Sequence, residues 1–190
     1  MDFVGEKQKS ASAEPAVFDR WSRFLDYLMG LRESGDRGAL ASLRRGLGYA
    51  PGEAVEMYPY VMPYLPADVQ DWEIDAAFLI AALFAYHPDP GGVGNMGDHF
   101  RQARDPQGDD TALERRFSVL LAAHPDDLPF HLRQAVSFLK SRQRAVPVNW
   151  PQLLRDVLAW GHPDRYVQRQ WARAFWGYRA APSSENQSQE

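Results

Sequence analysis

The chain has 190 residues, of which 45% are hydrophobic and 13% aromatic, which excludes a disordered protein and predicts one compact domain or two small helical ones. It contains no cysteine, which excludes disulfides, thiol catalysis and cysteine-ligated zinc or iron–sulfur centres. No run approaches the ~20 apolar residues of a membrane span, and residues 1–16 lack the apolar core of a signal peptide, so we expect a cytoplasmic protein without membrane contact.

The net charge of −4 is unevenly distributed along the chain. Residues 1–110 contain 10 Lys/Arg and 18 Asp/Glu, a net charge of −8, whereas residues 111–179 contain 11 Lys/Arg and 5 Asp/Glu, a net charge of +6. Two further glutamates follow Arg179. This asymmetry indicates that the basic part contacts a polyanion or an acidic partner.

The first part of the chain reads as helices interrupted by proline and glycine. Apolar spacing predicts a helix at about 15–34 and another at about 36–47, with Asp36 as the N-cap of the second. The prolines of YPYVMPYLP (58–66) exclude a continuous helix, and its aromatic rings fit a cover over the core better than a ligand cage. The most apolar segment, at about 70–86, predicts a central helix.

Residues 87–97 (HPDPGGVGNMG) predict a long flexible loop that leads into a short polar helix around Phe100. After DPQGDDT (105–111), Asp110 or Thr111 is the expected cap of a helix that runs to about 123. Further helices are predicted at about 126–143, 150–160 and 164–178, the middle one with Asn149 as its N-cap.

No strand pattern of useful length and no internal repeat is present. The sequence therefore predicts an all-α protein, a compact bundle of about eight helices in two packed halves. We expect these halves at 15–105 and 106–179, the second being the basic one, between disordered segments at 1–14 and 180–190.

Placing residues at 100° intervals sorts the basic side chains by helix face. On helix 126–143, Arg133 and Lys140 share an outer flank with Ser137, and Arg144 extends the line. The expected buried stripe of that helix is Leu128, Leu132, Ala135 and Leu139. On the last helix, Arg165, Arg169 and Arg173 are expected on an exposed face that includes Trp176. Its expected buried stripe is Val167, Trp171, Ala174 and Tyr178.

The same helix-face placement distinguishes the two members of each adjacent arginine pair, one beside the buried stripe and one facing outward. In the helix at 36–47, Leu40, Leu43 and Leu47 point inward. Arg44 flanks that seam beside Arg37, whereas Arg45 points outward. In ALERRFSVLL, Arg116 flanks the stripe of Leu113, Phe117 and Leu120, and Arg115 faces away.

Outward arginines are ordinary on a solvated helix face, but the two C-terminal basic stripes have no acid four residues away from any arginine. Such unpaired guanidinium groups favour an external anion, and phosphate suits their bidentate geometry. An exposed aromatic among them also suits a single strand, whose bases can stack. We therefore predict a nucleic-acid-binding surface. Its candidate residues are Arg37, Arg44, Arg45, Arg115, Arg116, Arg133, Lys140, Arg144, Arg165, Arg169 and Arg173.

Catalytic motifs are absent from the sequence. It has no GxxxxGK[ST] loop and no GxSxG elbow, and its five histidines show no HExxH or paired metal spacing. The acid pairs Asp109-Asp110 and Asp126-Asp127 stand where helices begin and fit caps. We expect no enzyme activity, no metal and no cofactor.

An ordered set of motifs resembles the CasB family, the small subunit of the type I-E CRISPR surveillance complex Cascade. The motifs are LRR (43–45), MPYL (62–65), DWEIDAAFLIAALFAY (71–86), ERRF followed by LL (114–121), LRQAV (132–136), NWPQLLRDVLAW (149–160) and QWARAFWGY (170–178). The likeness runs from about Phe18 to Tyr178.

The resemblance implies a non-catalytic helical subunit, present in two copies, that contacts the backbone subunits, the large subunit and the guide RNA. It further implies a basic surface that binds the displaced single-stranded non-target DNA and holds the R-loop open. The arginines in matching motifs are Arg44, Arg45, Arg115, Arg116 and Arg133. The alternative from another class is a helical protein–protein adaptor whose arginines meet acidic partners without nucleic-acid binding.

Overall fold

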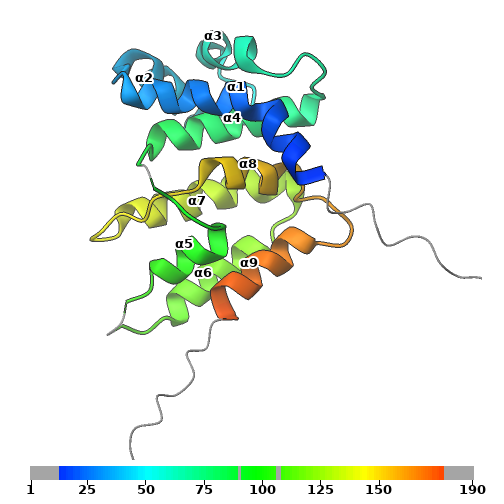
Figure 1. Ribbon diagram of the computed structural model, residues 1–190. Coiled ribbons are helices and arrows are strands. Elements are labelled where there is room, and N and C mark those ends of the chain that lie inside the picture. Colours follow the sequence, from blue (N-terminus) through cyan, green and yellow to red (C-terminus); the bar gives the residue numbers. More distant parts are fainter. Residues whose placement is uncertain (1–12, 90, 106–107, 178–190) are drawn as a thin grey trace, which may run out of the picture.

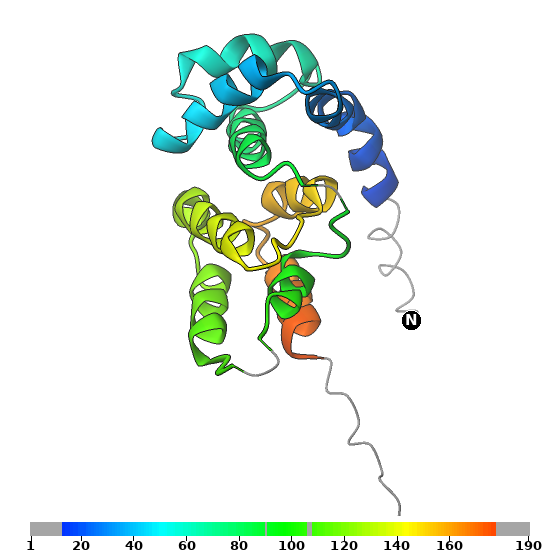
Figure 2. The same ribbon diagram turned by 90° about the vertical axis from the view of Figure 1, so that its left-hand side faces the viewer.

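The computed structural model describes residues 13–89, 91–105 and 108–177, and all regular structure within them is helical. Nine α-helices in this described part form three stacked layers (Figures 1 and 2). The upper layer contains α1 (Ala13–Glu33), α2 (Arg37–Arg45), α3 (Tyr58–Val61) and α4 (Asp71–Tyr86). The middle layer contains α7 (Leu128–Ser141) and α8 (Trp150–Leu158). The lower layer contains α5 (Met96–Gln102), α6 (Thr111–Leu121) and α9 (Tyr166–Trp176).

These helices confirm the all-α prediction. Four short 3₁₀ helices complete the regular structure of the described residues, at Gly46–Gly48, Val55–Met57, Met62–Tyr64 and Pro125–Asp127. The prolines of 58–66 limit the chain there to one α-helical turn and a 3₁₀ turn, as predicted. No helix in the described ranges is long and apolar enough to cross a membrane.

The helix starts follow the local capping chemistry. The Asp36 carboxylate accepts the N–H of Ala39 at 2.9 Å, and the Asn149 side chain accepts that of Gln152 at 3.2 Å, so both predicted caps are confirmed. At α6 the N-cap residue is Asp110, one of the two predicted, but its side chain makes no capping hydrogen bond. The Asp109 side chain accepts the N–H of Thr111 at 2.9 Å.

The centre of the fold is α4. Every residue from Ala76 to Ala85 is buried, because α2 and the 3₁₀ helix after it pack against α4, and α8 packs against it as well. The ring of Phe84 packs edge-on against Trp150 of α8, with 5.8 Å between centroids. A helix that is apolar on all faces has this place in a layered bundle, as its sequence predicted.

The lower layer is closed by α5 and α9, which pack closely together. Gly97 of α5 lies against the main-chain oxygen of Trp171 in α9, where a Cβ would collide with it. The helix begins at Met96 with Asn95 as its cap, so the predicted loop ends two residues early. Gly92 of that loop also lies against the main chain of Val148, which packs the loop rather than leaving it free.

The predicted boundary between residues 105 and 106 falls within this lower layer, because α5 precedes it and α9 follows it. Tyr178, most of the predicted disordered segment 1–14 and all of 180–190 lie outside the described residues. The helix predicted from residue 15 begins at Ala13.

Candidate nucleic-acid interface

Two of the predicted basic side chains connect α2 and α7 to the end of α4. Arg44 donates from Nε and Nη2 to the main-chain oxygen of Ala85, at 3.2 and 3.1 Å. Lys140 donates from Nζ to the oxygen of Tyr86 at 2.5 Å and lies 3.9 Å from the centre of the Tyr86 ring. Carbonyls in the last turn of a helix lack partners and form the negative end of its dipole, so these two cations stabilise the end of α4.

Arg133 of α7 donates from Nη2 to the main-chain oxygen of Tyr49, which ties α7 to the segment after α2. Its Nε is buried without a hydrogen bond, and burial lowers the pKa of this guanidinium. The Ser137 hydroxyl lies 3.4 Å from that of Tyr86. The flank predicted to face outward therefore packs partly on the upper layer. Placing residues at 100° intervals gave the wrong exposure for this flank, because that construction considers one helix alone and not the elements that pack on it.

Arg165 was placed on the exposed face of the last helix, but it precedes α9 in a left-handed conformation with φ of 49°. Its Nη2 donates to the oxygen of Leu121, in the last turn of α6, at 2.8 Å. The side chain remains exposed, yet it caps a helix in the way that Arg44 does. It therefore differs from Arg169 and Arg173.

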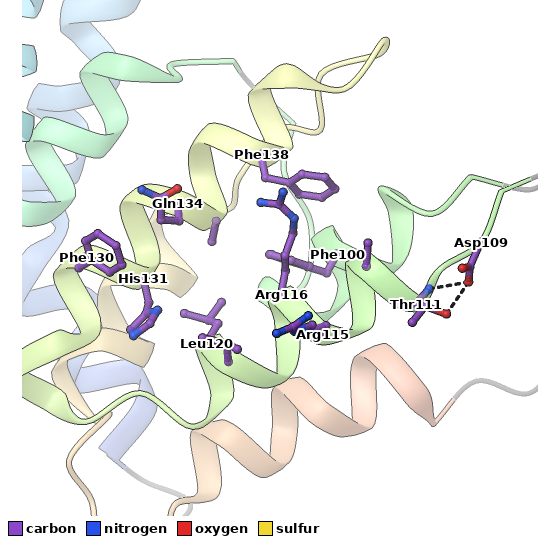
Figure 3. Close-up of a pocket in the computed structure, with 13 residues that line it drawn as sticks. Phe100, Asp109, Thr111, Arg115, Arg116, Leu120, Phe130, His131, Gln134 and Phe138 are labelled. Atoms are coloured by element: carbon purple, nitrogen blue, oxygen red, sulfur yellow. Dashed lines mark hydrogen bonds between the residues drawn. The ribbon is translucent and has the colours of Figure 1, made fainter.

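Arg115 and Arg116 lie in a groove between α6 and α7 of about 750 Å³, here called the α6–α7 groove (Figure 3). The Arg116 guanidinium lies 5.4 Å from the centre of the Phe138 ring, a cation–π distance. Phe130, which is 58% exposed, stands at the other end of the groove. Basic and aromatic side chains thus share one concave surface.

Six predicted residues are exposed, and their side chains have no hydrogen bond, ion pair or ring contact with any described residue. They are Arg37, Arg45, Arg115, Arg144, Arg169 and Arg173. The prediction that Arg44 flanks the seam while Arg45 points outward is confirmed. Arg45 therefore keeps all of its donors available to a ligand.

The pairing of arginines differs between the two parts of the chain. In the first part, Arg20 pairs with Glu73 at 2.6 Å, Arg101 with Asp98 at 2.8 Å and Arg104 with Asp110 at 3.4 Å. Leaving Arg155 aside, no lysine or arginine of residues 111–177 forms a salt bridge within the described chain. The sequence predicted that these basic residues lack an acidic partner on their own helix. In the described fold they lack one on other elements as well.

One aromatic contact of this surface was not predicted. Arg142, just after α7, lies 5.5 Å from the centre of the Phe138 ring, which Arg116 also approaches. The signal was available, because residues 138 and 142 stand four positions apart and face each other on a continued helix.

The two buried histidines serve the core. His87 Nε2 lies 2.8 Å from the oxygen of Val146, and His99 Nε2 accepts the N–H of Asn149 at 3.3 Å. Burial lowers the pKa of His99 to about 4. Within the described ranges, no three His, Asp or Glu side chains gather as metal ligands would.

Comparison with known proteins identifies the family. The family model described as CRISPR-associated protein Cse2 matches residues 39–176. The chain belongs to the Cse2 family. A Cse2 protein of Thermus thermophilus is 35% identical over 170 residues, which cover 88% of this chain and 95% of that protein.

Solved structures agree with the assignment to Cse2, which is also called CasB. CasB from Thermus thermophilus superposes with a TM-score of 0.69 and 33% identity, covering 83% of this chain and 97% of that one. A chain of a structure titled CRISPR RNA-guided surveillance complex gives a TM-score of 0.68 and 26% identity, covering 84% and 92%. The Cse2 fold therefore extends over most of the described residues.

Proposed function

We propose that this chain is a non-catalytic small subunit of a Cascade-type CRISPR RNA-guided surveillance complex, where it holds the displaced single-stranded non-target DNA. The observation that carries the proposal is the set of six exposed arginines without counter-charge, on a member of the Cse2 family. Each arginine that neutralises a phosphate releases condensed counterions, which favours binding regardless of sequence.

Such contacts suffice for the task because strand exchange is nearly balanced in energy. A guide–target duplex is about as stable as the DNA duplex that it replaces, so modest contacts to the strand backbone decide whether the R-loop persists. The partners in this proposal are the backbone and large subunits, the guide RNA and a second copy of the chain, in the cytoplasm.

The geometry divides the predicted residues by role. Arg44, Arg133, Lys140 and Arg165 each donate to a main-chain oxygen, so their first role is to hold the fold. The exposed, unpartnered arginines are the principal phosphate ligands. Arg116 adds a cation–π contact with Phe138, and Phe130 adds an exposed ring on which a base can stack.

The first test measures binding of a labelled single-stranded DNA to the full chain across a salt series. We expect sequence-independent binding that weakens steeply with salt, and Arg45→Ala and the double variant Arg169→Ala/Arg173→Ala to bind more weakly than wild type. Arg23→Ala is the matched control, because it removes an exposed arginine from the acidic part of the chain. Absent or salt-independent binding would favour the protein–protein adaptor.

The second test reconstitutes the surveillance complex with and without this chain and measures the lifetime of the R-loop on a matched target. Omitting the chain should shorten that lifetime, and the Arg169→Ala/Arg173→Ala variant should shorten it partly. An unchanged lifetime on omission rules out strand holding.

A further inference from the structure

A second groove has the opposite charge. It lies where the first turns of α4 face the end of α8 and the turn before α7, layers that adjoin in Figure 1, and has a volume of about 620 Å³. We call it the Trp72 groove. Leu79, Leu128 and Trp160 supply buried apolar walls, and Trp72, 56% exposed, stands at its rim with Asp75 and Asp126.

The lining of the Trp72 groove contains two carboxylates, one histidine (His162) and no lysine or arginine, and the Asp126 carboxylate lies 3.3 Å from His124 Nδ1. Asp75 has no hydrogen bond or ion pair with any described residue, and Asp71 stands one helical turn before it. Burial and the nearby Asp71 charge both raise the pKa of Asp75, and a cation placed beside it would favour its charged form. The α6–α7 groove, lined by Arg115 and Arg116, is the opposite case.

The walls of the groove are fixed before anything binds. The Trp160 indole donates to the oxygen of Ala123 at 3.1 Å, and the Gln168 side chain donates to the oxygen of Trp160 at 2.9 Å. On the other side, the Tyr58 hydroxyl holds the oxygen of Gly52 at 2.8 Å. A site held in this way loses little conformational entropy when it is filled.

We propose that the Trp72 groove binds a cationic, amphipathic segment of a partner protein. Apolar side chains of the segment enter between α4 and α8, while its lysines or arginines meet Asp75 and Asp126. An exposed tryptophan beside a preformed apolar groove has the composition of an interface hot spot. Nucleic acid does not fit, because phosphates would be repelled by the two carboxylates. This inference does not depend on the chain holding DNA.

The test titrates an amphipathic helical peptide of leucine and lysine into the full chain by calorimetry, with a leucine–glutamate peptide of the same pattern as charge control. We expect the lysine peptide alone to bind, and Trp72→Ser and Asp75→Lys to weaken it at least tenfold. Val119→Ser, which removes an exposed apolar side chain from the α6–α7 groove, should bind like wild type. Circular dichroism of each variant verifies its fold.

Three results would overturn the inference: no binding by wild type, equal binding by all variants, or binding of the glutamate peptide. A fourth such result would come from analytical ultracentrifugation. If wild type forms dimers and Trp72→Ser is monomeric, the groove binds a second copy of the chain instead. Single-stranded DNA binding by Trp72→Ser should equal that of wild type. Peptide binding therefore tests the Trp72 groove, and DNA binding tests the proposed function, so that one can fail without the other.

Discussion

Trp171 of α9 donates its indole N–H to the buried carboxylate of Asp156 in α8, at 2.7 Å. Asp156, 4% exposed, also accepts from the Gln152 side chain at 2.8 Å. This bond joins the lower layer to the middle one, beside the contact between the Trp160 and Trp171 rings, which are tilted at 53° with 4.9 Å between their centroids. A buried carboxylate is tolerated here because hydrogen-bond donors replace its water.

Removing that carboxylate should destabilise the protein. In Asp156→Ala the Trp171 N–H is buried without a partner, a cost of about 1–3 kcal/mol in the free energy of unfolding. Asp156→Asn keeps an acceptor and should lose less. Denaturant unfolding measures both, with the exposed Asp164→Ala as control. Equal stability of Asp156→Ala and wild type would show that the bond contributes nothing.

The adjacent arginines of α2 should respond differently to the same substitution. Arg44→Ala removes a charged donor from the end of α4 and should lower the unfolding free energy by about 1 kcal/mol. Arg45→Ala should leave stability unchanged and weaken binding of single-stranded DNA roughly three- to tenfold, equivalent to about 0.7–1.4 kcal/mol. Thermal unfolding and fluorescence anisotropy of both variants separate the two roles, and a reversed pattern would contradict them.

The salt dependence of DNA binding counts the phosphates that are neutralised. If Arg169 and Arg173 each contact one phosphate, the double alanine variant should lower the slope of log affinity against log salt by about 1.4, at ~0.7 per contact on a single strand. Unfolding should be unaffected, because neither side chain has a partner in the described fold. A variant that binds more weakly with an unchanged slope would contradict phosphate contact.

Acid should destabilise the protein through His99. Its pKa is about 4 in the folded chain against 6.5 for an ordinary histidine, so the unfolded chain takes up the proton first as pH falls. The neutral form in the core is therefore fully stabilising above pH 6.5, and roughly 3 kcal/mol is lost between pH 6.5 and 4.

The measurement compares unfolding free energies across that pH range for wild type and His99→Gln. The variant removes the titrating ring, so its stability should fall less steeply over the same interval. Exposed His124→Gln is the matched control and should follow wild type. Identical pH profiles for His99→Gln and wild type would remove His99 as the cause.

The sequence was most informative where structure is local. Helical periodicity located α4 to within one residue, and the Asp36 and Asn149 caps followed from side chains that bond three residues away. Such features depend on neighbours along the chain, which the sequence displays directly.

The partners of the basic residues could not be predicted in the same way. Arg44 donates to an oxygen 41 positions away, Lys140 to one 54 away and Arg133 to one 84 away. All three acceptors are main-chain carbonyls, which every residue type presents, so no side-chain pattern marks them. Lack of an acid on the same helix marked the exposed Arg169 and Arg173, but it marked the bonded Arg133 and Arg165 equally, so that signal alone did not separate the two groups.

The contact between Gly97 and Trp171 also bears on the order in which the chain folds. α5 has seven residues, fewer than the ~12–15 that an isolated helix needs in water, and its packing partner lies roughly 70 positions later. During synthesis, α2 and α4 can pack on one another as soon as both have left the ribosome, whereas the main packing partner of α5 is α9, which is made much later. We therefore expect the lower layer to be completed last, when α9 emerges and the long loop between α5 and α9 closes.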